Sequence, residues 1–287
     1  MNVLVTGGSG QLGLALQELA RQFPDLCCLF FDLPDLDVTD EAAVDAAMSR
    51  SRCHAVVNCA AYTAVDQAER DLELAFRVNR DAVGVLARRA ETRDVLLVHI
   101  STDYVFSGNS FRPYTERDTP DPLGVYGRSK LEGERLVREI GPSHIILRTS
   151  WLYSLYGRNF LTTMLRLGRE RDRLEVVVDQ VGTPTCALDL AGAILTILSN
   201  VRIGERYAGL YHYSNEGVCS WYDFAVSIMR MAMLPCRVFP IGSAAYPSLA
   251  PRPAYSVLDK AAIKEGWGLD IAHWQDSLGT LLARSGS

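Results

Sequence analysis

The sequence lacks several features that would place it in a specialised class of protein. No apolar run approaches the roughly 20 residues that a membrane-spanning helix needs. The first residues include neither the basic segment nor the long apolar segment of a secretory signal. Basic residues are not in excess, since 29 Lys and Arg stand against 34 Asp and Glu, a net charge of −5. We therefore expect a cytoplasmic protein that binds neither membranes nor nucleic acid.

The seven cysteines also lack a recognisable pattern. Their number is odd, they contain no Cys-x-x-Cys pair, and several lie within apolar runs such as 27–31 and 57–60. This usage favours buried thiols in a reducing compartment over a disulfide framework or a zinc site, so we expect no bound metal. Internal repeats and low-complexity segments are missing as well.

What the chain does contain is a regular alternation of two patterns. Short aliphatic runs, at 3–5, 29–31, 55–58, 96–100 and 145–147, alternate with segments of helical period. Continuous apolar strands separated by helices indicate a parallel sheet covered on both faces. With 287 residues and 48% hydrophobic content the chain can build a sizeable core. We predict an α/β fold, a Rossmann-type doubly wound parallel sheet with a smaller C-terminal substrate-binding lobe.

The boundary between the two parts is interleaved. We predict a first domain over 1–150 plus part of about 183–215, and a smaller ligand-binding lobe over about 151–182 and 216–287. Helices are expected over 72–90, from about 126, over 188–198, over 221–233 and over 273–284.

A glycine cluster follows the first strand and opens the first helix. Gly7, Gly10 and Gly13 have the spacing Gly-x-x-Gly-x-x-Gly. Glycines permit a tight turn and close approach of a pyrophosphate, and the helix N-terminus offers it free N–H groups. The alternative is a turn with a structural role only.

Asp32 ends the second predicted strand. A carboxylate at this point can bind the ribose hydroxyls of NAD, whereas the 2′-phosphate of NADP would need a basic partner, which residues 33–35 do not supply. The alternative is a strand-end carboxylate on the surface.

Tyr126 and Lys130 carry the strongest chemical signal. Four residues apart on a helix, they share one face. A neighbouring ammonium favours phenolate, so we expect Lys130 to lower the pKa of Tyr126 and make it a usable general acid. Thr102, at the end of an apolar strand, could hold a substrate carbonyl oxygen beside the phenol.

These motifs resemble those of the extended short-chain dehydrogenase/reductases and, within them, the dTDP-4-dehydrorhamnose reductase family. The narrower resemblance rests on residues 64–69, 101–106, 125–130, 148–153, 159–160, 179–185 and 209–212, with a thinner echo at 252–253 and 256–258. It covers nearly the whole chain.

The resemblance implies a set of site residues. The catalytic residues would be Tyr126, Lys130 and Thr102. The residues that bind NADPH or NADH would be Gly7, Gly10, Gln11, Leu12, Gly13, Asp32, Asp37, Val38, Ala60, Ala61, Tyr62, Ile100, Tyr126 and Lys130. The dTDP-sugar would meet Val65, Asp66, Thr102, Asp103 and Trp151. A plain core tryptophan is the alternative for Trp151, and Asn79 could join a proton relay or fill a packing gap.

The resemblance also implies a reaction, the NAD(P)H-dependent reduction of the C4 ketone of dTDP-4-dehydro-L-rhamnose in the biosynthesis of cell-surface polysaccharide. The alternatives are another nucleotide-sugar enzyme, either an epimerase or dehydratase or a different 4-ketosugar reductase, and a non-catalytic NADP-binding regulatory subunit. Some relatives carry glutamates thought to bridge subunits through Mg²⁺, where this chain has Ala15 and Leu188. We therefore expect a monomer or homodimer without metal.

Overall fold

The computed structural model describes residues 1–246 and 248–285, and a six-stranded parallel sheet forms its centre. In spatial order the strands are β10 (Ala208–Tyr213), β5 (His144–Thr149), β4 (Leu96–Thr102), β3 (Ala55–Asn58), β1 (Asn2–Thr6) and β2 (Cys27–Phe31). Strands β1, β3, β4 and β5 are almost wholly buried, as their continuous apolar runs predict. The predicted doubly wound α/β fold is confirmed.

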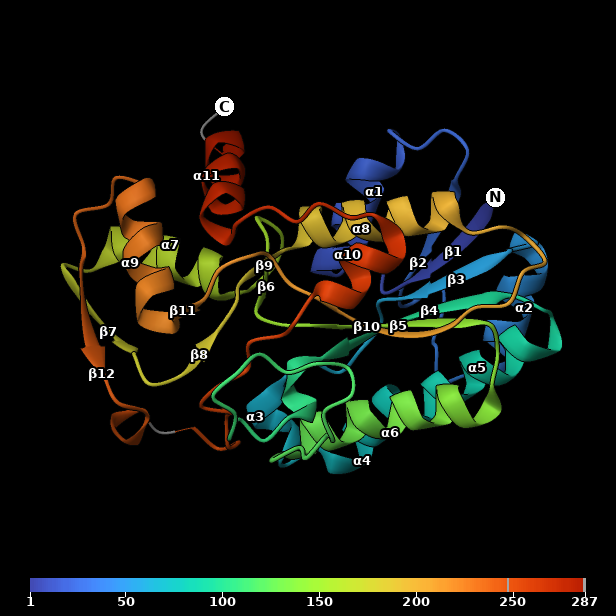
Figure 1. Cartoon of the computed structure of the whole chain (residues 1–287), viewed down its shortest axis with the longest axis horizontal. Helices are drawn as coiled ribbons and strands as arrows, with labels where there is room; N and C mark the ends of the chain where they lie inside the picture. The colour runs from blue at the N-terminus through green and yellow to red at the C-terminus, as the bar shows by residue number, and fades with distance from the viewer. Residues whose placement is uncertain (247, 286–287) are drawn as a thin grey trace.

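Helices cover both faces of the sheet (Figure 1). One face carries α1 (Gln11–Ala20), α8 (Ala187–Asn200) and α10 (Ala261–Trp267), which share one apolar core. The other carries α2 (Glu41–Ser51), α5 (Ala82–Thr92) and α6 (Val125–Ile140), which share a second core. The helix predicted over 188–198 packs on α1, on the same face of the sheet.

The long helix predicted over 72–90 is interrupted. It consists of α4 (Leu72–Phe76), a π-helical segment η1 (Arg77–Asp81) and then α5. The π segment places Asn79 beside α6, where a Cβ on Gly133 would lie 2.2 Å from the Asn79 carbonyl oxygen. Single π turns of this kind are frequent at functional sites.

The smaller lobe lies at one end of the sheet, at the left of Figure 1. Its helices are α7 (Phe160–Glu170), α9 (Trp221–Met231) and α11 (Trp274–Ser285), around a third apolar core. Its strand pairs are β7 (Arg173–Val177) with β12 (Arg237–Ile241), β8 (Val181–Gly182) with β11 (Cys219–Ser220), and β6 (Leu152–Tyr153) with β9 (Thr185–Cys186).

The remaining elements are short. They are α3 (Val65–Ala68) and two 3₁₀ turns, η2 (Asp103–Val105), which continues directly from β4, and η3 (Ser243–Ala245), which follows β12 in the smaller lobe. Within residues 1–246 and 248–285, no helix combines the length and the apolar character needed to cross a membrane. All seven cysteines are free, four of them buried, while Cys27 is exposed.

Candidate active site

The glycine-rich turn joins β1 to the N-terminus of α1. Gly7 has a φ of +67°, and a Cβ there would lie 2.6 Å from the backbone nitrogen of Ala60. A Cβ on Gly13 would lie 2.3 Å from the Gly7 carbonyl oxygen, so packing of the turn requires both glycines. Gly10 is exposed, and no side chain caps the helix at this residue. The first N–H groups of α1 can therefore receive an anion such as a pyrophosphate.

The two residues after Gly10 present different groups to this site. The Leu12 side chain is buried in the core, so only its backbone N–H can reach a ligand. Gln11 Oε1 accepts a hydrogen bond from Ser154 Oγ at 2.9 Å, which ties the start of α1 to the loop after β6.

Asp32 lies directly beside the glycine turn. Its Oδ2 accepts hydrogen bonds from Ser9 N at 2.9 Å and Ser9 Oγ at 2.6 Å, and its Oδ1 accepts one from Leu33 N. Partial burial opposes ionisation, but these bonds outweigh it and lower the pKa of Asp32. The carboxylate is therefore charged at neutral pH and fixed in place. Asp37 is exposed and Val38 half-buried, and the Asp37 carboxylate is held by Thr39.

The segment Ala60–Tyr62 is half-buried at the end of β3. Asn79, which is fully buried, accepts a hydrogen bond from Tyr62 N at 2.9 Å and donates to the Tyr62 carbonyl oxygen at 3.0 Å. Its Nδ2 also donates to Ser129 Oγ at 3.0 Å. Asn79 thus clamps this segment to α6, which is a larger role than filling a packing gap.

Lys130 reaches from α6 to the end of β4. Its ammonium donates to the Ile100 carbonyl oxygen at 2.6 Å, and the residue is 2% exposed. Burial lowers the pKa of Lys130 to about 8, although the nearby Glu134 charge acts in the opposite direction. Lys130 is therefore still mostly protonated at neutral pH.

Tyr126 departs from the sequence expectation. Its pKa is raised to about 12, because burial and the Asp103 charge outweigh the contact with the Thr102 hydroxyl. The prediction that Lys130 lowers this pKa is wrong for this structure, in which the Lys130 ammonium is engaged by Ile100. The Tyr126 phenol is a protonated acid at neutral pH.

Thr102 ends β4 and begins the 3₁₀ turn η2. Its Oγ1 accepts from Tyr104 N at 3.2 Å and donates to Asp103 Oδ1 at 3.1 Å. Thr102 and Asp103 are both buried, and burial raises the pKa of Asp103 to about 6. Thr102 and Tyr126 interact through their side chains, so the structure brings two of the three predicted catalytic groups into contact.

Asp66, predicted to bind the sugar, is held by the C-terminal part of the chain. Its carboxylate accepts from Arg252 Nη2 at 2.7 Å and from Ala250 N at 3.0 Å. Arg252 also interacts with the Tyr104 hydroxyl, and the Tyr104 ring packs edge-on against Tyr126 with centroids 5.5 Å apart. Asp66 thus belongs to a chain of contacts that ends at the candidate acid, and the neighbouring Val65 is half-buried.

Trp151 packs at the edge of the apolar core of the smaller lobe. It is half-buried, and its φ of +46° lies in the left-handed region, which costs a non-glycine residue on the order of 1–2 kcal/mol. Its ring stacks on Trp221 with centroids 3.6 Å apart. Such strain is typical of ligand sites.

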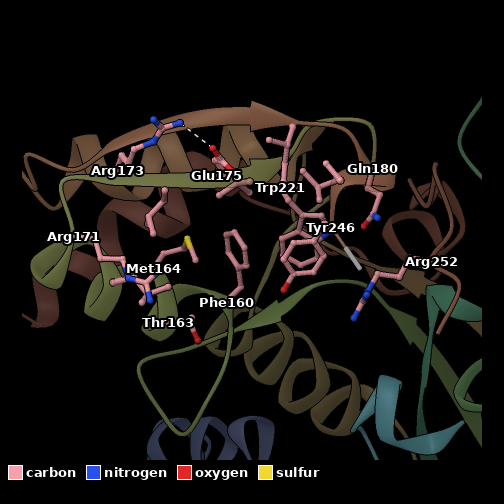
Figure 2. Close-up of a pocket in the computed structure, with 16 residues that line it drawn as sticks. Phe160, Thr163, Met164, Arg171, Arg173, Glu175, Gln180, Trp221, Tyr246 and Arg252 are labelled. Atoms are coloured by element: carbon pink, nitrogen blue, oxygen red, sulfur yellow. Dashed lines mark hydrogen bonds and ion pairs between the residues drawn. The ribbon is translucent and has the colours of Figure 1, made fainter. Parts of the chain in front are cut away.

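Trp221 leads into a pocket of about 640 Å³ within the smaller lobe. Figure 2 shows aromatic side chains, including Phe160 and Tyr246, in its middle, with Arg171 and Arg173 at one end and Arg252 at the other. An aromatic surface with cationic ends suits a ligand that combines a flat base with phosphates. Sequence reasoning missed this pocket because its residues come from α7, β7, α9, η3 and the loop around 252.

Glu69 was also missed. Its Oε1 accepts a hydrogen bond from Val125 N at 2.7 Å, at the start of the helix that carries Tyr126 and Lys130. A carboxylate at a helix N-terminus satisfies a free N–H and stabilises the helix dipole. The only sequence signal was an acidic residue within the 64–69 block.

The structure also places the two residues discussed for a bridging metal. Ala15 is fully buried in the core, and Leu188 packs at its edge. Over the described ranges 1–246 and 248–285, no group of three or more His, Cys, Asp or Glu residues is arranged to hold a metal ion.

Comparison with known proteins gives consistent results. The family described as the RmlD substrate binding domain matches residues 1–286. A dTDP-4-dehydrorhamnose reductase from Aggregatibacter actinomycetemcomitans is 41% identical over 98% of each chain. A probable dTDP-4,6-dihydroxy-2-methyloxan-3-one 4-ketoreductase from Streptomyces antibioticus is 42% identical over 97% of this chain and 93% of its own. The crystal structure of dTDP-4-dehydrorhamnose reductase from Bacillus anthracis, in complex with NADP, is 37% identical, covers 99% of each chain and has a TM-score of 0.93.

Proposed function

The chain belongs to the RmlD substrate binding domain family, and we propose which of its residues perform the reaction. It is an NAD(P)H-dependent oxidoreductase that reduces the C4 ketone of dTDP-4-dehydro-L-rhamnose to give dTDP-L-rhamnose, in polysaccharide biosynthesis. The observation that carries the residue assignment is the convergence of Thr102, Tyr126 and Lys130 at the end of β4.

The cofactor site fits a dinucleotide. The uncapped start of α1, next to the exposed Gly10, offers N–H groups to the pyrophosphate, and the ionised Asp32 would accept hydrogen bonds from ribose hydroxyls. Asp37, Val38 and the segment Ala60–Tyr62 complete the proposed binding surface, together with Ile100. When bound, the nicotinamide supplies the hydride.

Tyr126 donates the proton in this proposal. A phenol with a pKa of about 12 keeps its proton at neutral pH, and an alkoxide forming on the sugar is more basic still. Thr102, in contact with the phenol, holds the same oxygen. The high pKa that contradicted the sequence expectation therefore suits the direction of reduction.

Lys130 holds the cofactor in this proposal. Its ammonium is a buried positive charge one helical turn from Tyr126, held at the end of β4 by the Ile100 carbonyl oxygen. The same ammonium would bind the ribose hydroxyls of the nicotinamide half.

The smaller lobe binds the dTDP part of the substrate in this proposal. Trp151 and Trp221 form a stacked pair between the catalytic edge and the pocket, and Arg252, beside Tyr104, supplies positive charge for the diphosphate, while Arg171 and Arg173 lie at the far end. Val65, Asp66 and Asp103 would line the sugar side. This assignment corresponds to the predicted division into a cofactor domain over 1–150, with part of about 183–215, and a substrate lobe.

A coupled assay tests the function. The substrate is made from dTDP-glucose by a dehydratase and an epimerase, and the oxidation of NADH and of NADPH is followed separately. We expect oxidation that depends on the chain and on the 4-keto sugar. Absence of turnover with both cofactors, or catalysis on a UDP-hexose without net cofactor oxidation, would contradict the assignment and favour an epimerase.

A second candidate is a different 4-ketosugar reductase, which the 42% identity to the Streptomyces antibioticus protein favours. The chemistry at Tyr126 would be unchanged, because only the sugar's substituents differ. Comparison of kcat/KM for the two 4-keto sugars separates the candidates.

The location and assembly of the protein are also proposals. The free state of all seven cysteines supports a reducing compartment such as the cytoplasm. We propose a monomer or homodimer that binds the dTDP-sugar and no nucleic acid. Size-exclusion chromatography with light scattering tests the oligomeric state.

A further inference from the structure

A buried ion pair lies directly behind Lys130. Arg148 on β5 and Glu134 on α6 have side chains that are each only 2% exposed. Arg148 Nε donates to Glu134 Oε1 at 2.9 Å, and its Nη2 donates to Oε2 at 2.6 Å. Burying two charges is costly, and apolar pairs of similar volume are often at least as stable. Stability alone therefore gives little reason for this pair.

A third residue joins the pair to the catalytic strand. Ser101 Oγ donates to the same Glu134 Oε1. Ser101 lies opposite Arg148 in the register of β4 and β5, and Thr102 follows it directly. One carboxylate thus fastens the ends of two strands to the helix that carries Tyr126.

Lys130 and Glu134 are one helical turn apart and are held by consecutive residues of β4. The Lys130 ammonium binds the Ile100 carbonyl, and the Glu134 carboxylate binds the Ser101 hydroxyl. Because Arg148 occupies both oxygens of Glu134, the carboxylate stays close to Lys130 without pairing with it directly.

Among the titratable groups that surround Lys130, Glu134 is the negative charge that stabilises the ammonium. From the end of β3, Cys59 faces Lys130, but burial raises the pKa of its thiol to about 12, so it is neutral. From β4, His99 faces Lys130, and burial together with the Lys130 charge keeps its pKa well below the usual range, so it is neutral as well. Arg148, from β5, is positive and lies behind Glu134.

We propose that Glu134, fixed by Arg148 and Ser101, is a positioning residue that keeps the buried Lys130 protonated and holds α6 in register with Thr102. The proposal rests on the assigned roles of Tyr126 and Lys130. The proposal explains why a charged pair is buried at this place, although packing alone does not require one.

Glu134→Gln tests the charge. The amide keeps the shape of the side chain but removes the negative charge and leaves Arg148 positive. Lys130 should then lose its proton at lower pH, so the basic limb of the kcat profile should move down by about one pH unit or more. NADPH binding in the absence of sugar, measured by nicotinamide fluorescence, should weaken as the pH rises. In Glu134→Gln this weakening should begin at a lower pH than in the wild type, as the fall in kcat does.

Glu132→Gln is the matched control. Glu132 lies on the same helix, but its side chain is 38% exposed and it pairs with the exposed Arg135. This variant should keep the wild-type pH profile and NADPH affinity.

Ser101→Ala tests the register separately and serves if Glu134→Gln does not fold. It keeps the carboxylate's charge but removes the bond to β4. We expect kcat to fall by about tenfold, with the pH profile and the KM for NADPH unchanged.

The outcomes are decisive. A wild-type basic limb in Glu134→Gln, or an unchanged kcat in Ser101→Ala, overturns the proposal while leaving the proposed function intact. Absence of activity in the wild-type enzyme would instead overturn the proposed function, and the NADPH-binding profile would still test Glu134.

Discussion

The catalytic edge of the sheet and the pocket of the smaller lobe are built in opposite ways. At the catalytic edge, Thr102, Tyr126 and Lys130 are interlocked with backbone groups and with a buried ion pair. In the pocket, aromatic rings and arginines from five separate segments face a space of about 640 Å³. The difference indicates that the chemistry is fixed by short spacings on single elements, whereas recognition of the nucleotide depends on how distant segments meet.

Removal of the Tyr126 hydroxyl should have the largest effect on the catalytic edge. Tyr126→Phe deletes the proton donor, so kcat should fall by at least ~100-fold with little change in NADPH affinity. Steady-state kinetics and fluorescence titration measure the two quantities. Tyr104→Phe, on the ring 5.5 Å away, is the matched control and should change kcat by only a few-fold. Near-normal turnover in Tyr126→Phe would refute the acid assignment.

Two substitutions in the glycine turn should distinguish a glycine needed for packing from one needed for close approach of the ligand. Gly13→Ala puts a Cβ 2.3 Å from the Gly7 carbonyl oxygen, so the turn must shift, with a loss of stability of about 1–3 kcal/mol and a weaker affinity for NADPH of at least tenfold. Gly10→Ala brings a Cβ no closer than 3.3 Å and should retain stability while weakening NADPH binding. Thermal unfolding and titration of both variants give the comparison. Equal melting temperatures for the two would show that packing does not require Gly13.

Substitution in the pocket should affect substrate affinity without affecting chemistry. Trp221→Leu removes the ring that stacks on Trp151, so the KM for the dTDP-sugar should rise by about tenfold while kcat stays within a few-fold. Trp267→Leu, in the helix that packs on β10, is the control and should leave KM unchanged. A fall in kcat with constant KM for Trp221→Leu would remove the distinction between the two regions.

The last prediction concerns the buried Asp103 and affects stability rather than catalysis. Its pKa of about 6 lies above the ordinary value of an aspartate, about 3.8, so the folded state binds more protons than the unfolded state between these values. Its contribution to stability therefore falls as pH rises from about 4 to about 6. Asp103→Asn should remove this loss, which is roughly 2–3 kcal/mol in the free energy of unfolding. The melting temperature of the variant, relative to that of the wild type, should therefore rise between pH 4 and pH 7. A constant difference in melting temperature between the two proteins across this pH range would contradict the raised pKa of the buried Asp103.

Much of the catalytic edge could be predicted from the sequence. The strands, the glycine turn and the Tyr126–Lys130 pair depend on spacings of a few residues, which hydrophobic period and helix geometry determine. The pKa of Tyr126 could not be predicted, because it depends on burial and on Asp103, which lies on a different element. The Ser101–Glu134–Arg148 cluster was missed for a similar reason, since strand register brings Ser101 opposite Arg148.

The pocket of the smaller lobe could be predicted only in outline. The resemblance placed Trp151 and Asp66 near the substrate, but the ion pair of Asp66 with Arg252 joins residues 186 positions apart. The pocket's aromatic and cationic residues have no common spacing in the sequence, so no periodic signal could reveal them. Only the packing of α7, α9 and the β7–β12 pair brings them together.

The most direct test of the central claim is to locate the transferred hydrogen in the product. The wild-type enzyme is given dTDP-4-dehydro-L-rhamnose and NADPH carrying deuterium at the transferable position of the nicotinamide. The proposed reduction at C4 predicts one deuterium at C4 of the sugar in dTDP-L-rhamnose, detected by NMR, with one NADPH oxidised per product. Product without deuterium at C4, or conversion of the sugar without net NADPH oxidation, would contradict it.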